Sequence, residues 1–156
     1  MTGHDYHDRD SQFGFRQVDY EAIQHIPILR ESWTLSFHAV ARTTVLKDDQ
    51  QVPFFMLPSL GGGNDLRGFS SWRFRDRNSL LLQGEWRIMV NRFMDTAVFY
   101  DAGKVTAHKS DLDFHDLKSD YGFGARFHTP FATPLRIEYA KSSEGRALIF
   151  AVSPVF

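Results

Sequence analysis

The sequence predicts an all-β chain: an antiparallel transmembrane β-barrel of seven to eight strands with one long loop that folds inward. Three observations support this fold class. Apolar and polar residues alternate with a period of two, the alternating segments are long, and the connections between them are short and long in turn. A period of two is typical of a strand with one face in an apolar medium and the other in a polar one.

The segment 79–90 (SLLLQGEWRIMV) shows the alternation most clearly. One face, from Leu80 to Val90, is apolar throughout, whereas the opposite face carries Gln83, Glu85 and Arg87. In a membrane barrel the apolar face contacts lipid and the polar face lines the lumen. We therefore expect Glu85 to point into the barrel.

Seven segments carry this pattern, and none shows helical periodicity. The expected strands are residues 13–26, 33–45, 77–90, 94–103, 120–129, 134–141 and 147–156. Most have nine or more residues, longer than the usual five or six of globular strands. Roughly 9–11 residues are what a tilted strand needs to cross a bilayer.

The early segments differ in how clearly they alternate. Residues 13–26 (FGFRQVDYEAIQHI) keep the register mainly through Val18, Tyr20 and Ala22. Residues 33–45 alternate cleanly, with an apolar face that begins at Trp33. We expect both to be membrane strands.

The later segments complete the set. Residues 94–103 place Val98 and Tyr100 on one face, and residues 120–129 alternate aromatic side chains with glycine, arginine and histidine. Residues 134–141 (PLRIEYAK) alternate apolar and charged side chains, and the last segment ends on Phe156. These patterns again predict one apolar and one polar face.

The connections alternate in length along the first five links. In order, they are residues 27–32, 46–76, 91–93, 104–119 and 130–133, short and long in turn. Transmembrane barrels have short turns on one side of the membrane and long loops on the other. The loop over 46–76 is the longest and is the one expected to fold inward.

A soluble β-sandwich or small barrel also produces alternating strands. Strand length favours the membrane, and so does the scarcity of polar interruptions on the apolar faces. Aromatic residues also lie at strand ends, as in the interfacial girdle of membrane barrels. The residues concerned are Trp33, Phe93, Tyr121, Phe127 and Phe156.

Length and composition set further bounds. A chain of 156 residues suits one domain, which we place at 13–156, with 1–12 as a polar tail or an extra strand. The net charge of −1 provides no general attraction for nucleic acid, and the absence of cysteine excludes disulfides and thiolate metal sites. The first residues, MTGHDYHDRDSQ, show no signal peptide.

Several motifs occur together in a recognisable order: LGGGNDLRGF, RDRNSLLLQGEWR, VFYDAGKV, YGFGARFHTP, PLRIEYA and the terminal Phe156. In this the chain resembles the C-terminal barrel half of the outer-membrane assembly and two-partner-secretion superfamily, the bacterial surface antigen domain of BamA-like and TpsB-like proteins. The resemblance covers residues 13–156. It implies a location in the bacterial outer membrane and a non-enzymatic part in protein insertion or translocation.

The resemblance also implies a site. In that family the inward loop has an Arg-Gly-aromatic tip, which corresponds here to Arg67, Gly68 and Phe69. The wall partners of the arginine correspond to Glu85, Phe99 and Asp101. The alternation of the strands independently places these three side chains on the lumen face. An arginine in a narrow lumen needs a carboxylate, because an unpaired buried ion is costly.

Other kinds of site are weakly supported. The glycine run lacks the lysine and the following helix of a phosphate-binding loop, and Asp76 interrupts the basic run RFRDR. HDYHDRD and HKSDLDFHD carry metal-capable residues without the spacing of a known site. No nucleophile lies on a recognisable elbow. We therefore expect no enzyme, cofactor, metal or nucleic-acid partner.

An odd number of strands raises the question of closure, because an open edge in lipid leaves backbone groups unsatisfied. Residues 1–12 could close a small barrel, two copies could join edge to edge, or the chain could be a fragment of a sixteen-strand barrel. We favour the fragment or the dimer. The alternative function is a small closed or dimeric barrel acting as a structural, pore or ligand-binding protein. Expected partners are the bilayer and assembly machinery that recognises Phe156.

Overall fold

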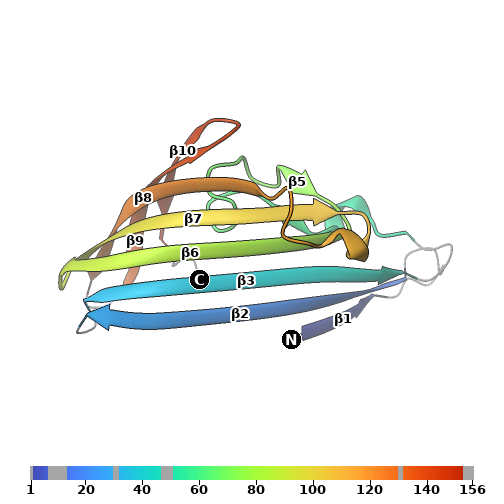
Figure 1. Ribbon diagram of the computed structural model, residues 1–156, viewed down its shortest axis with the longest axis horizontal. Helices are drawn as coiled ribbons and strands as arrows, with labels where there is room; N and C mark the ends of the chain where they lie inside the picture. The colour runs from blue at the N-terminus through green and yellow to red at the C-terminus, as the bar shows by residue number, and fades with distance from the viewer. Residues whose placement is uncertain (1, 7–13, 30–31, 47–50, 130–131, 153–156) are drawn as a thin grey trace.

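The chain forms one antiparallel sheet of eight strands (Figure 1). The computed structural model describes residues 2–6, 14–29, 32–46, 51–129 and 132–152. The strands of the sheet, in chain order, are β1 (Thr2–Tyr6), β2 (Phe15–Leu29), β3 (Trp33–Leu46), β6 (Asn78–Asn91), β7 (Met94–Thr106), β8 (Lys118–Thr129), β9 (Ala132–Ser142) and β10 (Arg146–Ala151). The all-β antiparallel class expected from the alternation is confirmed.

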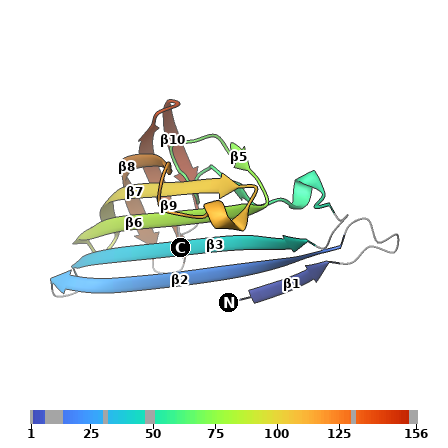
Figure 2. The same cartoon turned by 45° about the vertical axis from the view of Figure 1, so that its right-hand side comes forward.

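The sheet is a simple meander, because each strand pairs with the next one in the order β1-β2-β3-β6-β7-β8-β9-β10. Short turns join β2 to β3, β6 to β7 and β8 to β9 at one end, and the longer segments leave the other end (Figure 1). The sheet curls, so that β8, β9 and β10 turn over the segment between β3 and β6 (Figure 2). The result is a curved wall with an inner and an outer side.

The wall is open in the part of the chain that the structure describes. Residues 2–6 add an eighth strand, but β1 pairs with β2 alone, and β10 pairs with β9 alone. The strand at residues 2–6 therefore does not close a small barrel. No helix among the described residues is long and apolar enough to cross a membrane.

Burial is inverted relative to a soluble protein. Phe123 and Phe150 on the outer side are 60% and 66% exposed, whereas Glu85 and Arg126 on the inner side are 1% and 2% exposed. Apolar groups outside and charged groups inside are what a barrel wall in lipid requires. The face assignments expected from the alternation follow this division.

The segment of residues 51–77, between β3 and β6, lies against the inner side of the wall (Figure 2). It is more ordered than the simple loop expected from the sequence, because it contains a 3₁₀ turn, η1 (Phe54–Met56), and a small hairpin of β4 (Ser59–Leu60) and β5 (Phe74–Arg75). A second 3₁₀ turn, η2 (Lys109–Asp111), lies between β7 and β8. We call residues 51–77 the inner segment.

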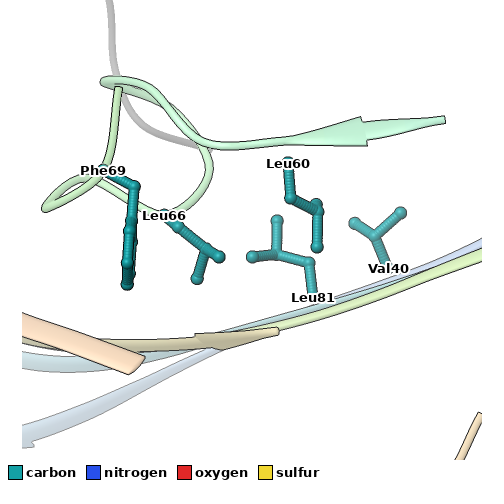
Figure 3. Close-up of a cluster of buried hydrophobic side chains, with 5 residues drawn as sticks. All are labelled: Val40, Leu60, Leu66, Phe69 and Leu81. Carbon is teal, nitrogen blue, oxygen red and sulfur yellow. The ribbon is translucent and has the colours of Figure 1, made fainter. Parts of the chain in front are cut away.

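A small apolar core fixes the inner segment to the wall (Figure 3). Leu60, Leu66 and Phe69 of the segment pack against the wall. The wall residues are Val40 of β3 and Leu81 of β6, which are directly opposite in register. Burial of five large apolar side chains, at about 1.5–3 kcal/mol each, provides non-specific adhesion of the segment. The polar contacts beside this core determine its orientation.

Candidate functional site

The tip of the inner segment, here residues 61–69, is a compact series of turns. Gly62 N–H donates to the Leu66 carbonyl at 3.2 Å, and Phe69 N–H donates to the same carbonyl at 3.1 Å. Gly61 and Gly62 have φ values of +112° and +115°, which residues with a Cβ rarely adopt. The tip therefore presents Arg67 to the wall on a tightly folded backbone.

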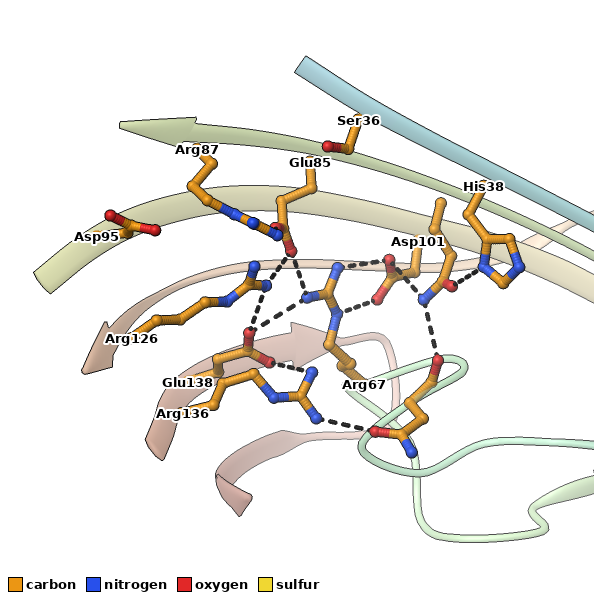
Figure 4. Close-up of polar contacts among 12 residues, drawn as sticks. Ser36, His38, Arg67, Glu85, Arg87, Asp95, Asp101, Arg126, Arg136 and Glu138 are labelled. Carbon is orange, nitrogen blue, oxygen red and sulfur yellow. Dashed lines mark hydrogen bonds and ion pairs between the residues drawn. The ribbon is translucent and has the colours of Figure 1, made fainter. Parts of the chain in front are cut away.

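Arg67 is buried and forms a two-point ion pair with Asp101 of β7 (Figure 4). Its Nε lies 2.7 Å from Asp101 Oδ2, and its Nη2 lies 2.8 Å from Asp101 Oδ1. Its Nη1 reaches Glu85 Oε2 at 3.2 Å and Glu138 Oε1 at 3.4 Å. A planar guanidinium suits such a fixed arrangement of carboxylates, because its donors lie in a rigid fork.

The Arg67 guanidinium also stacks on the wall. Its Cζ lies 3.3 Å from the centroid of the Phe99 ring. Gly122 of β8 is directly opposite Phe99 in register, and a Cβ at Gly122 would meet the Phe99 ring. The missing side chain at Gly122 thus makes room for the ring beneath Arg67, and the stacking adds a cation–π contact.

Further arginines of the wall enclose the same carboxylates. Arg126 Nη2 contacts Glu85 Oε2 at 2.5 Å and Glu138 Oε1 at 3.3 Å. Arg136 holds the tip from the other side, because its Nη2 donates to the Gly63 carbonyl at 3.0 Å and to Asn64 Oδ1 at 2.9 Å. The tip is therefore fixed by contacts from β6, β7 and β9, and Arg126 of β8 holds two of the carboxylates that bind Arg67.

The tip adds a cation to the buried carboxylates of the wall. The wall contributes four carboxylates and three guanidinium groups, and the tip contributes the fourth guanidinium. The carboxylates are Glu85, Asp101, Asp120 and Glu138, and the wall arginines are Arg87, Arg126 and Arg136. Buried ions are tolerated when paired and hydrogen-bonded, so without Arg67 the wall residues Glu85, Asp101 and Glu138 lose a cation that they share.

The charges around Arg67 keep it protonated. Burial alone lowers the pKa of Arg67, but the hydrogen bond and charge of Asp101, with the charges of Glu138 and Glu85, outweigh that effect and raise it. Arg67 therefore stays a cation at any pH at which the protein is folded.

The two residues after Arg67 set the closeness of the contact. A Cβ on Gly68 would lie 2.6 Å from Cβ of Asp120 and 3.0 Å from Cβ of Ser142. Ser142 Oγ also donates to the Gly68 carbonyl at 2.8 Å. Phe69 turns into the apolar core, where it meets Phe74 edge-on at 5.1 Å. Glycine at position 68 is thus required by the close approach of the tip to β8 and β9.

A polar chain extends from the tip towards β2. Gln83 Nε2 donates to the Asp65 carbonyl at 2.8 Å and to Asp101 Oδ1 at 3.3 Å. Gln83 Oε1 lies 2.8 Å from Nδ1 of His38, whose Nε2 lies 2.9 Å from Glu21 Oε1. The contacts of the tip therefore involve β3 and β2 as well.

The structure brings together the residues singled out from the sequence: Arg67 meets Glu85, Phe99 and Asp101, and Gly68 and Phe69 adjoin it. Phe156 lies outside the described residues. Sequence reasoning did not select Gln83, Asp120, Arg126, Arg136 and Glu138 as members of the site. Their alternation already placed them on the inner face, and that was the available signal.

The residues of the weaker candidates make other contacts where the structure describes them. No group of three histidine or acidic side chains among them is placed to hold a metal ion. Within HKSDLDFHD, Asp113 instead pairs with Lys104 at 2.7 Å. Much of HDYHDRD lies outside the described residues. Arg73 and Arg75 make separate contacts, with Glu144 and with the Phe54 carbonyl.

An apolar outer side, a charged inner side and an inner segment held by a buried arginine define a wall of an outer-membrane β-barrel. Comparison with known families agrees, because the Omp85 superfamily domain matches residues 6–147. The chain belongs to the Omp85 superfamily.

Solved structures give the same fold. The chain is similar to BamA from Haemophilus ducreyi in a crystal structure lacking POTRA domains 1–3, with a TM-score of 0.72 and 20% sequence identity. The alignment covers 90% of this chain and 34% of that one, so the chain spans about a third of the structure it matches. No match was found among curated proteins.

Proposed function

We propose that this domain takes part in inserting or translocating proteins at the bacterial outer membrane, without a chemical step of its own. Membership of the Omp85 superfamily supports this proposal. The observation that carries it is the brace formed by Arg67, which joins the inner segment to β6, β7 and β9 through Glu85, Asp101 and Glu138. A barrel that inserts or translocates other proteins has to keep the shape of its wall while neighbouring strands rearrange.

In this proposal the Arg67 brace holds the inner part of the wall, and the edge strands β1 and β10 pair with other strands. β1 and β10 end the strand order, so each has one side without a strand partner in the described residues. In lipid every backbone N–H and C=O needs a partner, because no water is present. The partner is a further strand of barrel wall, a second copy of this chain, or a strand of a client protein. A further wall strand or a second copy would complete the barrel. Pairing with a client strand would instead let the edge guide the insertion of that client.

The test is a reconstitution with a client. The chain is folded into liposomes, an unfolded outer-membrane β-barrel protein is added, and its folding is followed by its band shift on gels. We expect the wild-type chain to accelerate client folding and Arg67→Ala to abolish the acceleration. Arg73→Ala is the matched control, because Arg73 is on the same segment but forms only one exposed ion pair.

The reverse result defines the alternative function. If the wild-type chain folds stably in liposomes but leaves the client's folding rate unchanged, the proposal is wrong. The chain would then be a structural, pore-forming or ligand-binding barrel. Dye release from the same liposomes separates a pore from a sealed barrel.

Two partner proposals accompany this function. The terminal aromatic, Phe156, serves as the signal by which the outer-membrane assembly machinery recognises the chain itself. A second copy covers the β1 or β10 edge when no other strand does. Deleting Phe156 tests the first through the yield of membrane-inserted chain, and the mass of the folded protein in detergent tests the second.

A further inference from the structure

The outer face of the wall has a row of residues that changes character towards the β10 edge. Phe37, Gly84, Tyr100, Tyr121, Lys141 and Arg146 are successive register partners across β3, β6, β7, β8, β9 and β10. Directly opposite residues of an antiparallel pair lie on the same face. The row therefore starts apolar, continues with two tyrosines and ends with two cations.

Lys141 and Arg146 are an unusual pair. They are direct cross-strand partners, and both are exposed. Like charges placed opposite one another destabilise a sheet. Among the described residues neither has an acidic group within ion-pair distance, and Glu144, the acid in the turn between them, is bound by Arg73 at 2.8 Å. The two charges thus lack a counter-ion from the described protein.

An apolar groove adjoins this cation pair on the same face. It has a volume of about 480 Å³ and is lined mainly by Trp86, Phe123, Ala125, Phe127, Tyr139 and Leu148. Tyr139 and Leu148 are two residues along β9 and β10 from Lys141 and Arg146, so they share the outer face with them. Ala125 lies between larger neighbours, which leaves the hollow. An apolar chain descending from the cation pair would enter the groove.

We propose that this part of the wall binds one phosphate-bearing lipid, with its phosphate between Lys141 and Arg146 and an acyl chain in the groove. Charge complementarity identifies the occupant, because the site combines two adjacent cations lacking an acidic partner with a mainly apolar groove. Tyr100 and Tyr121 belong to the same row of register partners as Lys141, and tyrosines are enriched at the boundary between hydrocarbon and headgroups. A lipid phosphate lies at that boundary, and a zwitterionic headgroup offers less net attraction.

The position of the site means that the lipid would affect the pairing of β9 with β10. β10 is the last strand of the described sheet, and the lipid would be bound against its outer face and that of β9. Its phosphate would relieve the repulsion between Lys141 and Arg146 and so strengthen the pairing of β9 with β10.

The experiment uses quenching of Trp86 by brominated lipids. The chain, with Trp33 and Trp72 replaced by Phe, is folded into phosphatidylcholine vesicles containing a small fraction of brominated phosphatidylglycerol or brominated phosphatidylcholine. Each nearby cation favours an anionic lipid by about fivefold, so we expect the two cations together to give phosphatidylglycerol a preference of roughly twentyfold. Lys141→Gln combined with Arg146→Gln should reduce this preference to about onefold.

Two further variants make the result specific. Arg92→Gln with Lys109→Gln removes the same charge from two exposed positions that do not line the groove and should keep the preference. Arg146→Glu replaces the repulsive pair by an attractive one, so it should fold at least as well as the wild type and still lose the preference. Equal quenching by the two lipids in the wild type, or an unchanged preference in Arg146→Glu, would overturn the proposal.

Discussion

Arg67 and Asp101, which are 34 residues apart in sequence, form a two-point ion pair with both partners buried. The geometry is specific, since two parallel N–H···O contacts fix the orientation of the guanidinium as well as its distance. The Phe99 ring below the guanidinium removes the remaining freedom of tilt. The pair therefore sets both the position and the orientation of the inner segment, which its apolar core alone would leave loosely defined.

Removing the arginine should destabilise the domain strongly. Arg67→Ala leaves Glu85, Asp101 and Glu138 without one cation, and breaking a buried pair costs about 3–5 kcal/mol. The free energy of unfolding, measured by urea titration of the detergent-folded protein, reports this loss.

Arg73→Ala provides the comparison on the same segment. Arg73 pairs with Glu144 in an exposed position, where an ion pair contributes roughly 0–1 kcal/mol. Equal losses for the two variants would mean that the buried cluster contributes no more than a surface pair.

The close approach of the tip should make Gly68 intolerant of any side chain. In Gly68→Ala the new Cβ meets Asp120 and Ser142, and overpacking of this kind costs about 1–3 kcal/mol. We expect the tip to move from the wall, so that proteolysis of the inner segment becomes faster. Gly84→Ala is the control, because a Cβ there has its nearest neighbours at 3.9 Å. Identical cleavage rates for the two variants would contradict the close packing.

The two faces of β6 should respond oppositely to a charge. Ile88 shares the outer face with Trp86, and a charge on the lipid face costs roughly 2–4 kcal/mol at the middle of the bilayer and less towards the interface. Ile88→Arg should therefore make folding into liposomes less favourable, by at most that amount. Met89→Arg places the same charge one residue further on, on the inner face, and should cost much less. A smaller effect for Ile88→Arg than for Met89→Arg would reverse the face assignment.

Asp65 should make stability depend on pH. Burial raises the pKa of the Asp65 carboxyl above its ordinary 3.8; nearby Arg42 and His38 oppose this shift, and Asp101 adds to it. Because the folded-state pKa is the higher one, the folded protein binds more protons, and this contribution to stability is lost as pH rises from 3.8 through the folded-state value. Asp65→Asn does not titrate, so it should gain stability relative to the wild type at neutral pH.

The measurement compares the unfolding free energies of Asp65→Asn and the wild type at about pH 3 and about pH 7. The gain of the variant should be confined to the higher pH. A gain that is constant with pH, or greatest in acid, would show that burial does not raise the pKa of the Asp65 carboxyl.

Much of the wall could be predicted from the sequence because strand alternation is local. A period of two assigns each side chain to one face without knowledge of its neighbours, so Glu85, Phe99 and Asp101 could be placed on the inner face. The family resemblance then singled out Arg67 as their partner. The lengths of the strands and connections predicted an antiparallel membrane barrel for the same local reason.

The composition of the cluster depended on tertiary structure. Alternation places Arg126, Arg136 and Glu138 on the inner face, but it does not say which inner residues meet, because that depends on register and on the curl of β8, β9 and β10 over the inner segment. The hairpin of β4 and β5 was also missed, since each strand has only two residues and no period to detect.

The sequence by itself determined the strands, their faces and the tip motif, because these follow from the order of side chains along the backbone. The tertiary structure decided that Arg67 is shared among Glu85, Asp101 and Glu138, and that Lys141 and Arg146 lie side by side. Such meetings join residues far apart in the chain or on different strands. Their geometry exists only once the register is set and the sheet has curled.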